Sequence, residues 1–327
     1  MMIALTFDPS NDEFVIREIP TPTPGPREVL VKVAACGLNP VDAKITRWKV
    51  RVPGMDEDWT PGLDVSGEIV AVGQDVSTWK AGDRVLYHGN MLCPHGGLAQ
   101  YALHKATTLL PHPSVPPEVA AATPCAGWTA WRALHDKLRL TAEDSLLVTG
   151  GSGGVGGFAI QIARDLGLRQ ILATCSAKNR DYVISLGATA AIDYSAEDVA
   201  ARVRELTGGQ GVSRALDTVG PDEDLAVAES LAFEGEMVEL VDTVRPGDYR
   251  DSFLRGLSFH QLAFGAAHRA GPEGEARIVR AGEACCRMLE EGRLKVPTLE
   301  TITLAEAGSR LVEIRNRRSV GKLVVVF

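Results

Sequence analysis

The segment GGSGGVGG, residues 150–157, has residue types and spacing suited to holding a phosphate. Gly151, Gly153 and Gly156 fit the pattern G-x-G-x-x-G, between the apolar run SLLVT and the helical pattern FAIQIARDLG. Glycines at this spacing allow a tight turn and let the backbone approach a pyrophosphate. A helix that begins directly after the turn offers free N–H groups and the positive end of its dipole to the same anion. A flexible loop is the alternative, but it has no reason to stand between a strand and a helix. The segment predicts a dinucleotide-binding turn formed by Gly151, Ser152, Gly153, Gly154, Val155 and Gly156.

The end of the next predicted strand, QILATC, bears on which dinucleotide is bound. An NAD site usually has Asp or Glu about 20 residues after the glycines, on the ribose hydroxyls. Here Cys175 and Ser176 take that place, and Lys178 and Arg180 follow. The two cations are either a solvated helix start, where they would oppose the helix dipole, or partners of an anion. A hydroxyl and two cations suit a 2′-phosphate, so the segment favours NADP(H).

Two further segments end predicted strands in the same part of the chain. They are DTVG, which contains Val219 and Gly220, and ELVD, which contains Val241. Ligands of parallel α/β sheets bind at the carboxyl ends of the strands. We therefore expect Val219 and Val241 to contact the cofactor.

Three stretches of the chain, which differ in composition and periodicity, must position these residues. Residues 1–120 contain short β-branched runs separated by turn residues, as in a small barrel or sandwich. Residues 121–262 alternate strands and helices, which indicates a doubly wound parallel sheet. Residues 263–327 return to mixed character and end in the strand GKLVVVF. The sequence predicts an α/β protein of two domains, consistent with its 327 residues.

Composition excludes several classes of partner. The net charge of -8 disfavours nucleic acid and anionic membranes, since both select a basic face. The sequence has no apolar run near the roughly 20 residues of a membrane span, and its start, MMIALTFDPSND, does not resemble a signal peptide. The 6 cysteines have no framework spacing, which is typical of free thiols in a reducing compartment. We expect a cytoplasmic protein with a small-molecule partner, no nucleic acid and no membrane.

Several segments together resemble one known family. They are PGLDVSGEIVAVG, GDRV, GGLAQYAL, VTGGSGGVGGFAIQIA, SLGATAAIDY, LDTVG and GKLVVVF. They are similar to the zinc-independent quinone oxidoreductases, the zeta-crystallin-like branch of the medium-chain dehydrogenase/reductases. The resemblance runs almost from end to end. It implies a GroES-like β-barrel catalytic domain over residues 1–120, completed by 263–327, and a Rossmann NADP-binding domain over 121–262.

Zinc-dependent relatives have the same fold, so their ligand positions must be compared. A catalytic zinc needs three Cys, His or acidic ligands and an open position. The resemblance places Asn39, Leu63 and Cys125 at those positions. Cys36 is out of register, and Cys93 and His95 form a pair without further ligands. The sequence therefore predicts no metal site.

The resemblance also implies roles for single residues. Asn39 of NPVD is expected to face the nicotinamide as an amide donor. Asp42 either orients this loop or caps the turn. Thr129 of GWTAW either contacts the nicotinamide or is an ordinary residue inside a helix. Tyr194 is expected beside the 2′-phosphate and Lys322 near the cofactor. Trp48 stands where many relatives have a tyrosine, so the proton donor is not identified.

These expectations lead to one function and two alternatives. The expected function is NADPH-dependent hydride transfer to a quinone or an α,β-unsaturated carbonyl compound, without a metal. An alcohol or aldehyde dehydrogenase is one alternative, which the missing zinc ligands disfavour. A non-catalytic NADPH-binding protein is the other, since some relatives are lens proteins. The resemblance also implies a homodimer through the Rossmann domains, with residues 233–243 as an edge strand that pairs with the second copy.

Overall fold

The computed structural model describes residues 1–52, 54–316 and 320–327, and its contacts divide the chain into two compact units. Unit 1 contains residues 1–128, 264–292 and 298–327, and unit 2 contains residues 129–263 and 293–297. The sequence places the first division after residue 120. Helix α3 (Pro117–Ala121) packs against strands of the first sheet, so this part of the chain stays with unit 1.

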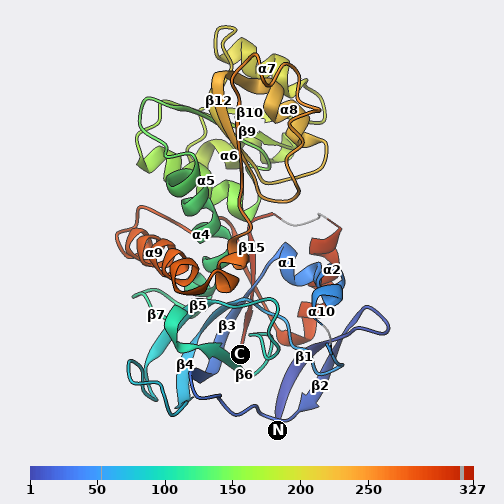
Figure 1. Ribbon diagram of the computed structural model, residues 1–327, viewed down its shortest axis with the longest axis vertical. Helices are drawn as coiled ribbons and strands as arrows, with labels where there is room; N and C mark the ends of the chain where they lie inside the picture. Colours follow the sequence, from blue (N-terminus) through green and yellow to red (C-terminus); the bar gives the residue numbers. More distant parts are fainter. Residues whose placement is uncertain (53, 317–319) are drawn as a thin grey trace. The chain divides into compact units, whose positions relative to one another are not determined.

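Unit 1 is built on a mixed sheet, antiparallel except for the parallel pair β14 and β15, and on a separate hairpin (Figure 1). In the described residues the sheet has the order β14-β15-β3-β4-β5-β7, with β6 also paired to β3. Its strands are β3 (Glu28–Leu38), β4 (Asp64–Val72), β5 (Arg84–His88), β6 (Tyr101–Lys105), β7 (Leu110–Pro111), β14 (Leu299–Ile302) and β15 (Lys322–Val326). The hairpin consists of β1 (Met2–Asp8) and β2 (Glu13–Ile19). The helices that begin in this unit are α1 (Pro40–Ala43), α2 (Ile45–Trp48), α3, α4 (Pro124–Arg132), α9 (Gly271–Glu290) and α10 (Leu304–Arg315).

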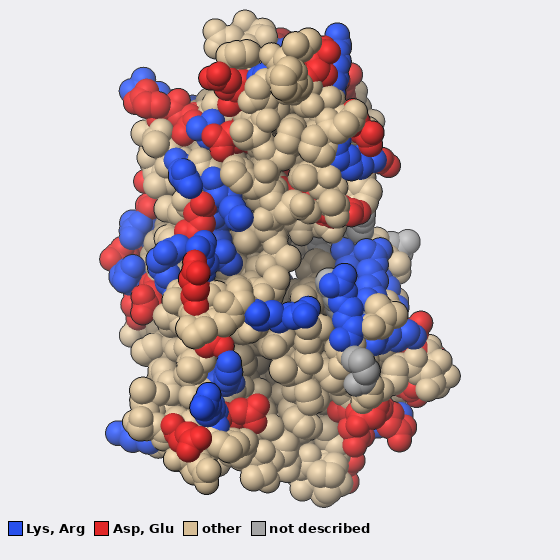
Figure 2. All heavy atoms as spheres, in the orientation of Figure 1, with Lys and Arg blue, Asp and Glu red and all other residues tan. Residues whose placement is uncertain are grey.

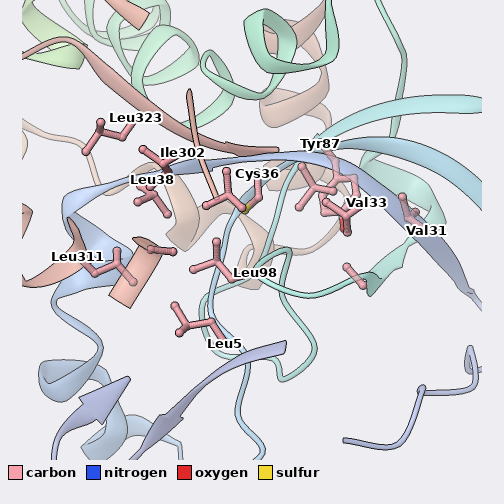
Figure 3. Packing of buried hydrophobic residues seen from close by; sticks show 14 of the residues in the cluster. Leu5, Val31, Val33, Cys36, Leu38, Tyr87, Leu98, Ile302, Leu311 and Leu323 are labelled. Carbon is pink, nitrogen blue, oxygen red and sulfur yellow. The ribbon is translucent and has the colours of Figure 1, made fainter. Parts of the chain in front are cut away.

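The pairing of β15 with β3 brings distant parts of the sequence together. The strands are antiparallel, and Leu323 pairs with Leu38. Lys322, the first residue of β15, therefore lies beside the turn that follows β3. Apolar side chains from both strands enter one core with residues of β1 and α10. Figure 3 shows Leu5, Cys36, Leu38, Leu311 and Leu323 among the residues packed there. This core fixes the position of the turn at residue 39.

Unit 2 is a parallel sheet with the order β10-β9-β8-β11-β12-β13 in the described residues. Its strands are β8 (Ser145–Val148), β9 (Gln170–Cys175), β10 (Ala190–Asp193), β11 (Val212–Asp217), β12 (Leu231–Glu239) and β13 (Ser258–Gln261). Its helices are α5 (Gly154–Asp165), α6 (Arg180–Leu186), α7 (Val199–Leu206) and α8 (Glu223–Ser230), after a short π-helical stretch at Ala133–Lys137. Strand β8 and its neighbours are almost entirely buried, as expected of a parallel sheet covered on both faces.

The predicted edge strand is wrong. Residues 231–239 form β12, which pairs with β11 on one side and with β13 on the other. The edges of the described sheet are β10 and β13. The sequence of β13, SFHQ, is short and half polar, so it gives no apolar strand signal, and the sheet therefore continues one strand further than predicted.

Acidic and basic side chains are interspersed over most of the face shown in Figure 2. One basic group stands out over α2 and the turn that follows it, where Arg47, Lys49 and Arg51 occur. Lys49 in this group is paired with Asp12 at 2.8 Å. Among the described residues, every helix is too short or too polar to cross a lipid bilayer.

Candidate functional site

The glycine turn of unit 2 joins β8 to α5 with little room for side chains. Its backbone is held by hydrogen bonds from Gly151 N to Thr174 O (2.8 Å) and from Gly153 N to Gly150 O (2.9 Å). Gly150 has φ of +63°, a region that favours glycine. A Cβ on Gly156 would lie 2.3 Å from the Gly150 carbonyl oxygen. The first turn of α5 therefore packs directly on the preceding turn, and any side chain at position 156 would push them apart.

The N-terminus of α5 has no side-chain cap. Gly153 is the N-cap residue and has no side chain to accept from the first N–H groups of the helix. The first N–H groups of a helix have no partner within it and therefore need an acceptor. An anion at this end would accept from them and would also be stabilised by the helix dipole. The turn and the helix thus fit a pyrophosphate, as the sequence predicts.

The ends of β9 and β10 carry the residues expected at the 2′-phosphate. Ser176 follows β9 directly, the Lys178 side chain is exposed, and Tyr194 follows β10 and is 53% exposed. Asn179, which the sequence analysis does not single out, donates from Nδ2 to Ser152 Oγ and to Ser176 Oγ, each at 3.2 Å. Asn179 therefore ties the glycine turn to the end of β9. Its position between Lys178 and Arg180 in the sequence is a signal that could have pointed to it.

Arg180 does not stand free beside these residues. Its guanidinium pairs with the Glu197 carboxylate, which also accepts from Asp193 N at 2.8 Å. The arginine is 44% exposed, and an ion pair at such a site contributes about 0–1 kcal/mol. A phosphate can displace a carboxylate that is held this weakly by the arginine. The exposed side chain of Lys178 can meet a phosphate directly.

The ends of β11 and β12 are packed against each other. Gly220 has φ of +95°, and a Cβ there would lie 2.6 Å from Val241 Cγ1. Val219 N donates to Asp217 Oδ1 at 2.9 Å, and Val241 N donates to Glu239 Oε1 at 2.6 Å. The two residues expected to contact the cofactor therefore each sit in a turn held by the carboxylate that precedes it.

In unit 1, the Asn39 side chain lies in a buried polar cluster. Its Nδ2 donates to Asp64 Oδ2 at 2.9 Å and to Gly37 O at 3.3 Å. Its Oδ1 accepts from Lys322 Nζ, which also donates to Leu38 O at 3.1 Å. Asn39 is 1% exposed, Asp64 0% and Lys322 4%. The cluster is thus a buried carboxylate and a buried ammonium joined through one amide.

The expected role of Asn39 as an amide donor to the nicotinamide stays a prediction, and the structure shows how its amide is used within the protein. The amide has two hydrogens, and both are given to protein acceptors, so neither is left for an acceptor molecule. The cause is Asp64, whose other oxygen accepts from Cys125 N at 2.9 Å and which the sequence analysis does not single out. Asn39 is therefore a positioning residue that holds Asp64 and Lys322. The ammonium of Lys322 is likewise held inside unit 1 and not presented at a surface.

Asp42 holds the turn after Asn39 in place. Its Oδ2 accepts from Asn39 N at 2.9 Å, and its Oδ1 accepts from Gly62 N at 3.2 Å. Asp42 thus both caps α1 and ties it to the segment before β4, which covers both roles considered for it. Burial raises the pKa of Asp42 to about 7, and the charge of Asp64 adds to the rise. Burial raises the pKa of Asp64 to about 6, while Lys322 opposes the rise in both groups.

A cavity of about 430 Å³ lies within unit 1 beside this turn. Among its lining residues are Asp42, Trp59, Leu63, Tyr87 and His95. Tyr87 is 2% exposed, and among the described residues nothing hydrogen-bonds to its hydroxyl. Burial raises the pKa of Tyr87 well above its usual value, so the group is a neutral phenol. The size and the mixed lining fit a small organic ligand. Sequence reasoning missed Tyr87 because RVLYHG has only a strand pattern.

Thr129 and Trp48 both lie in helices. Thr129 is 7% exposed and lies inside α4, the alternative considered for it. Trp48 ends α2, and its side chain lies outside what the structure describes.

Comparison with known proteins extends these observations. Residues 25–114 match the family model of the alcohol dehydrogenase GroES-like domain, and residues 154–242 match that of the zinc-binding dehydrogenases. The chain is 42% identical over 197 residues to the chloroplastic quinone oxidoreductase QR1 of Triphysaria versicolor, covering 56% of this chain and 57% of that protein. It is 32% identical over 316 residues to a trans-enoyl reductase of Aspergillus terreus, covering 92% and 86%. The chain thus spans little more than half the length of the first relative and most of the second.

Solved structures with the same fold cover the whole chain. A quinone oxidoreductase of Pseudomonas syringae superposes with a TM-score of 0.88 at 28% identity, over 100% of both chains. A mycobacterial protein in complex with NADPH superposes with a TM-score of 0.86 at 25% identity, also over 100% of both chains.

The chain belongs to the quinone oxidoreductase branch of the medium-chain dehydrogenase/reductase superfamily. The expected fold class, an α/β protein with a GroES-like domain and a Rossmann-type domain, is confirmed.

A member of this superfamily must be tested for a catalytic zinc. Leu63 has no ligand atom, and the Asn39 amide oxygen already accepts from the Lys322 ammonium. Cys125 is the only one of the three residues with a ligand that zinc prefers, and burial raises the pKa of its thiol well above the usual range. In the part of the chain that the structure describes, three or more His, Cys, Asp or Glu side chains nowhere gather as a metal would need. These residues do not fit the zinc of the zinc-dependent relatives.

The Lys322 cation should matter most when its two carboxyl neighbours are ionised. The pKa values of Asp42 and Asp64 are raised above the ordinary value of about 3.9, so stability falls as the pH rises from about 4 to about 7. Lys322→Met removes the positive charge that stabilises the two ionised carboxylates and so limits this loss of stability. We expect it to lower the free energy of unfolding at pH 8 by about 3–5 kcal/mol, the usual cost of breaking a buried ion pair, and by clearly less at pH 5. Denaturant unfolding at the two pH values measures this.

Lys80→Met is the matched control, because Lys80 is exposed and its side chain is outside the cluster. It should change neither value. An equal loss at pH 5 and pH 8 for Lys322→Met would mean that the ammonium contributes by packing alone.

Proposed function

We propose that this protein is an NADPH-dependent oxidoreductase that transfers a hydride to a quinone or an α,β-unsaturated carbonyl compound without a metal. The observation that carries the proposal is the uncapped N-terminus of α5 behind a turn in which Gly156 meets the Gly150 backbone. A bound nicotinamide supplies the hydride chemistry, and the protein supplies binding, orientation and electrostatics. The relative of Triphysaria and the structural neighbour of Pseudomonas, both named as quinone oxidoreductases, support this choice.

The choice of NADPH over NADH rests on the end of β9. The position where NAD sites have a carboxylate is filled by Cys175 and Ser176, so the carboxylate that binds the ribose hydroxyls of NAD is missing from that position. The exposed Lys178 side chain and the Ser176 hydroxyl would hold this phosphate, with Tyr194 after the next strand. The mycobacterial neighbour in complex with NADPH supports the choice.

Metal independence is a further part of the proposal. The place of the zinc ligands is taken by Asn39, Leu63 and Cys125, and the nearby cation is an ammonium that is already paired. The positive charge is not presented to an acceptor, because Lys322 is 4% exposed and donates to Asn39 and Leu38. Other donors must therefore meet the acceptor oxygen.

We propose that the unit 1 cavity takes the acceptor and that Tyr87 donates to its oxygen. A buried hydroxyl without a partner costs about 1–3 kcal/mol, and the tyrosine that carries it lines the cavity, so an acceptor atom bound at this wall would relieve that cost. Hydride transfer to a conjugated carbonyl compound leaves negative charge on the oxygen, and a fixed donor lowers the energy of that state. A neutral phenol can give this hydrogen bond.

A substrate panel tests the reaction class. NADPH oxidation should be followed with a benzoquinone, an enone, an enoyl thioester and a simple aldehyde. Reduction of one of the three conjugated acceptors, unaffected by a chelator, is the expected result. Oxidation of NADPH only by the aldehyde would favour the alcohol dehydrogenase reaction instead. NADPH binding without turnover on any acceptor would favour a non-catalytic protein.

Lys178→Ala should reduce the preference for NADPH. A charge-assisted hydrogen bond contributes about 1.5–3 kcal/mol, so the NADPH affinity should fall roughly ten- to a hundredfold. The NADH affinity should hardly change, because NADH has no 2′-phosphate. Dissociation constants of both cofactors, from nicotinamide fluorescence, measure this.

The control for this experiment is Arg169→Ala, which removes an exposed cation just before the other end of β9. It should leave both affinities unchanged. Equal affinity of the unmodified protein for NADPH and NADH would contradict the assignment of Lys178.

Tyr87→Phe should make the protein less active without making it less stable. Loss of the hydrogen bond to the charged oxygen should lower kcat/KM for the acceptor at least about tenfold, or 1.4 kcal/mol. The free energy of unfolding should stay the same or rise, because an unpartnered hydroxyl is removed from a buried site. Steady-state kinetics and denaturant unfolding give the two quantities.

Tyr101→Phe is the matched control, since Tyr101 packs in a different apolar cluster of unit 1. It should change neither quantity. Unchanged kcat/KM for Tyr87→Phe would remove this tyrosine from the acceptor site.

We also propose that the protein is a cytoplasmic homodimer joined through unit 2. All 6 cysteines are free thiols, which supports a reducing compartment. Strand β13 ends the described sheet, and an edge strand presents unpaired backbone groups that a second copy can pair. Light scattering at micromolar concentration should give twice the chain mass of 35.0 kDa. A mass of one chain would contradict the dimer.

A further inference from the structure

Two buried carboxyl groups face each other at the ends of β11 and β12. Asp217 and Glu239 are the last residues of these parallel strands and are paired in register. Paired residues of neighbouring strands, about 4.8 Å apart, point to the same face of a sheet. Asp217 is 0% exposed and Glu239 2%. Neither residue belongs to the glycine turn or to the 2′-phosphate position.

One oxygen of each carboxyl group is fully used. Asp217 Oδ1 accepts from Thr149 Oγ1 at 2.6 Å, from Val219 N at 2.9 Å and from Gly220 N at 3.4 Å. Glu239 Oε1 accepts from Val241 N at 2.6 Å and from Asp242 N at 3.0 Å. These two oxygens hold the turns that contain Val219 and Val241.

The second oxygen of each group is buried and lacks a donor. Among the described residues, nothing hydrogen-bonds to Asp217 Oδ2 or to Glu239 Oε2. Two ionised carboxylates cannot bond to each other, because neither has a hydrogen to give. Like charges on two neighbouring buried side chains also repel strongly. One proton between the two groups removes both problems at once.

We propose that Asp217 and Glu239 share one proton, and that this proton holds the two strand-end turns in the conformation that binds the nicotinamide dinucleotide. The binding part of this inference rests on the proposed function. Glu239 is the protonated partner, since three donors favour the charged form of Asp217. Its hydroxyl then donates to Asp217 Oδ2. Both residues are positioning residues, which act through the turns.

The network also reaches the glycine turn. Thr149, which donates to Asp217, is the residue between β8 and Gly150, and its Oγ1 accepts from Thr218 N at 2.9 Å. The Thr218 hydroxyl donates to Thr149 O at 2.7 Å. The ends of β8, β11 and β12 are therefore joined through one acid pair. Loss of the shared proton should therefore loosen the ends of all three strands.

The other groups around the pair do not supply a compensating charge. On β13 the residue paired with Glu239 is the uncharged Gln261. Asp242, three residues after Glu239, is acidic and therefore brings no positive charge. The Tyr249 phenol, whose pKa is raised to about 12 by burial, donates to Asp224, and Arg245 pairs with that same aspartate. Burial, and then the charge of Asp217, raise the pKa of Glu239 to about 8, in agreement with a shared proton at neutral pH.

The test compares the unmodified protein with Glu239→Gln between pH 6 and pH 9.5. The glutamine keeps an oxygen for Val241 N and Asp242 N and gives Asp217 a permanent N–H donor. The dissociation constant of NADPH for the unmodified protein should rise about tenfold above pH 8, within the limit of one decade per pH unit set by a single proton. Glu239→Gln should show no such rise. Titration of NADPH itself cancels in the comparison.

Glu234→Gln is the matched control, because it makes the same change on an exposed residue of the same strand. It should reproduce the unmodified pH profile. Identical profiles for the unmodified protein and Glu239→Gln would overturn the inference.

A second measurement needs no cofactor and separates the inference from the proposed function. A raised pKa in the folded state means that stability falls as the pH rises from about 4.5 to 8, and Glu239→Gln should fall less over this range. Absence of NADPH binding at pH 6 would refute the proposed function and the binding part of the inference. A smaller fall in stability for Glu239→Gln than for the unmodified protein would still support the shared proton. An equal fall in both proteins would overturn the shared proton.

Discussion

A buried ammonium is tolerated in a folded protein only where other groups replace the water it loses. Lys322 meets this condition through Asn39 Oδ1, Leu38 O and the Asp64 carboxylate 3.8 Å away. These partners come from β3, the turn after it and β4, while Lys322 begins β15. The last strand therefore must pair with β3 in one register, because a shift by one residue would move the charge away from its partners. The turn at Asn39, the capping contact of Asp42 and the wall of the cavity all follow from this pairing.

The same condition explains why Asn39 serves the cluster and not an acceptor molecule. An amide can give two hydrogens and accept at one oxygen, and here all of these are used between a carboxylate, a carbonyl and an ammonium. Removing the amide from a buried site would leave two opposite charges without their common partner. Turnover lost on substitution of Asn39 would therefore report the position of the turn. The Tyr87 hydroxyl, which has no partner among the described residues, is the better candidate for direct contact with an acceptor.

The sequence predicts well what neighbouring residues determine together. The glycine turn, the strand before it and the order of α5, β9 and α6 are local patterns, and each is confirmed. Asp64 could not be found this way, because it meets Asn39 across 25 residues and Lys322 meets Asn39 across 283. The edge of the parallel sheet was predicted one strand too early, because the four residues of β13 carry no apolar alternation. Long-range pairing, rather than residue type, decides these features.

The two units deal with paired buried acids in different ways. In unit 1, Asp42 and Asp64 raise each other's energy when ionised, and the Lys322 cation compensates for both. In unit 2, no cation hydrogen-bonds to Asp217 or Glu239 among the described residues. A proton takes the place of the cation in the arrangement proposed here. The compensating group is a side chain in unit 1 and a titratable proton in unit 2. The turn at Asn39 is held by the Lys322 cation together with Asp42 and Asp64, whose pKa values are raised to about 7 and about 6. With the proposed shared proton, the turns at Val219 and Val241, which are expected to contact the cofactor, loosen when the acid pair loses that proton.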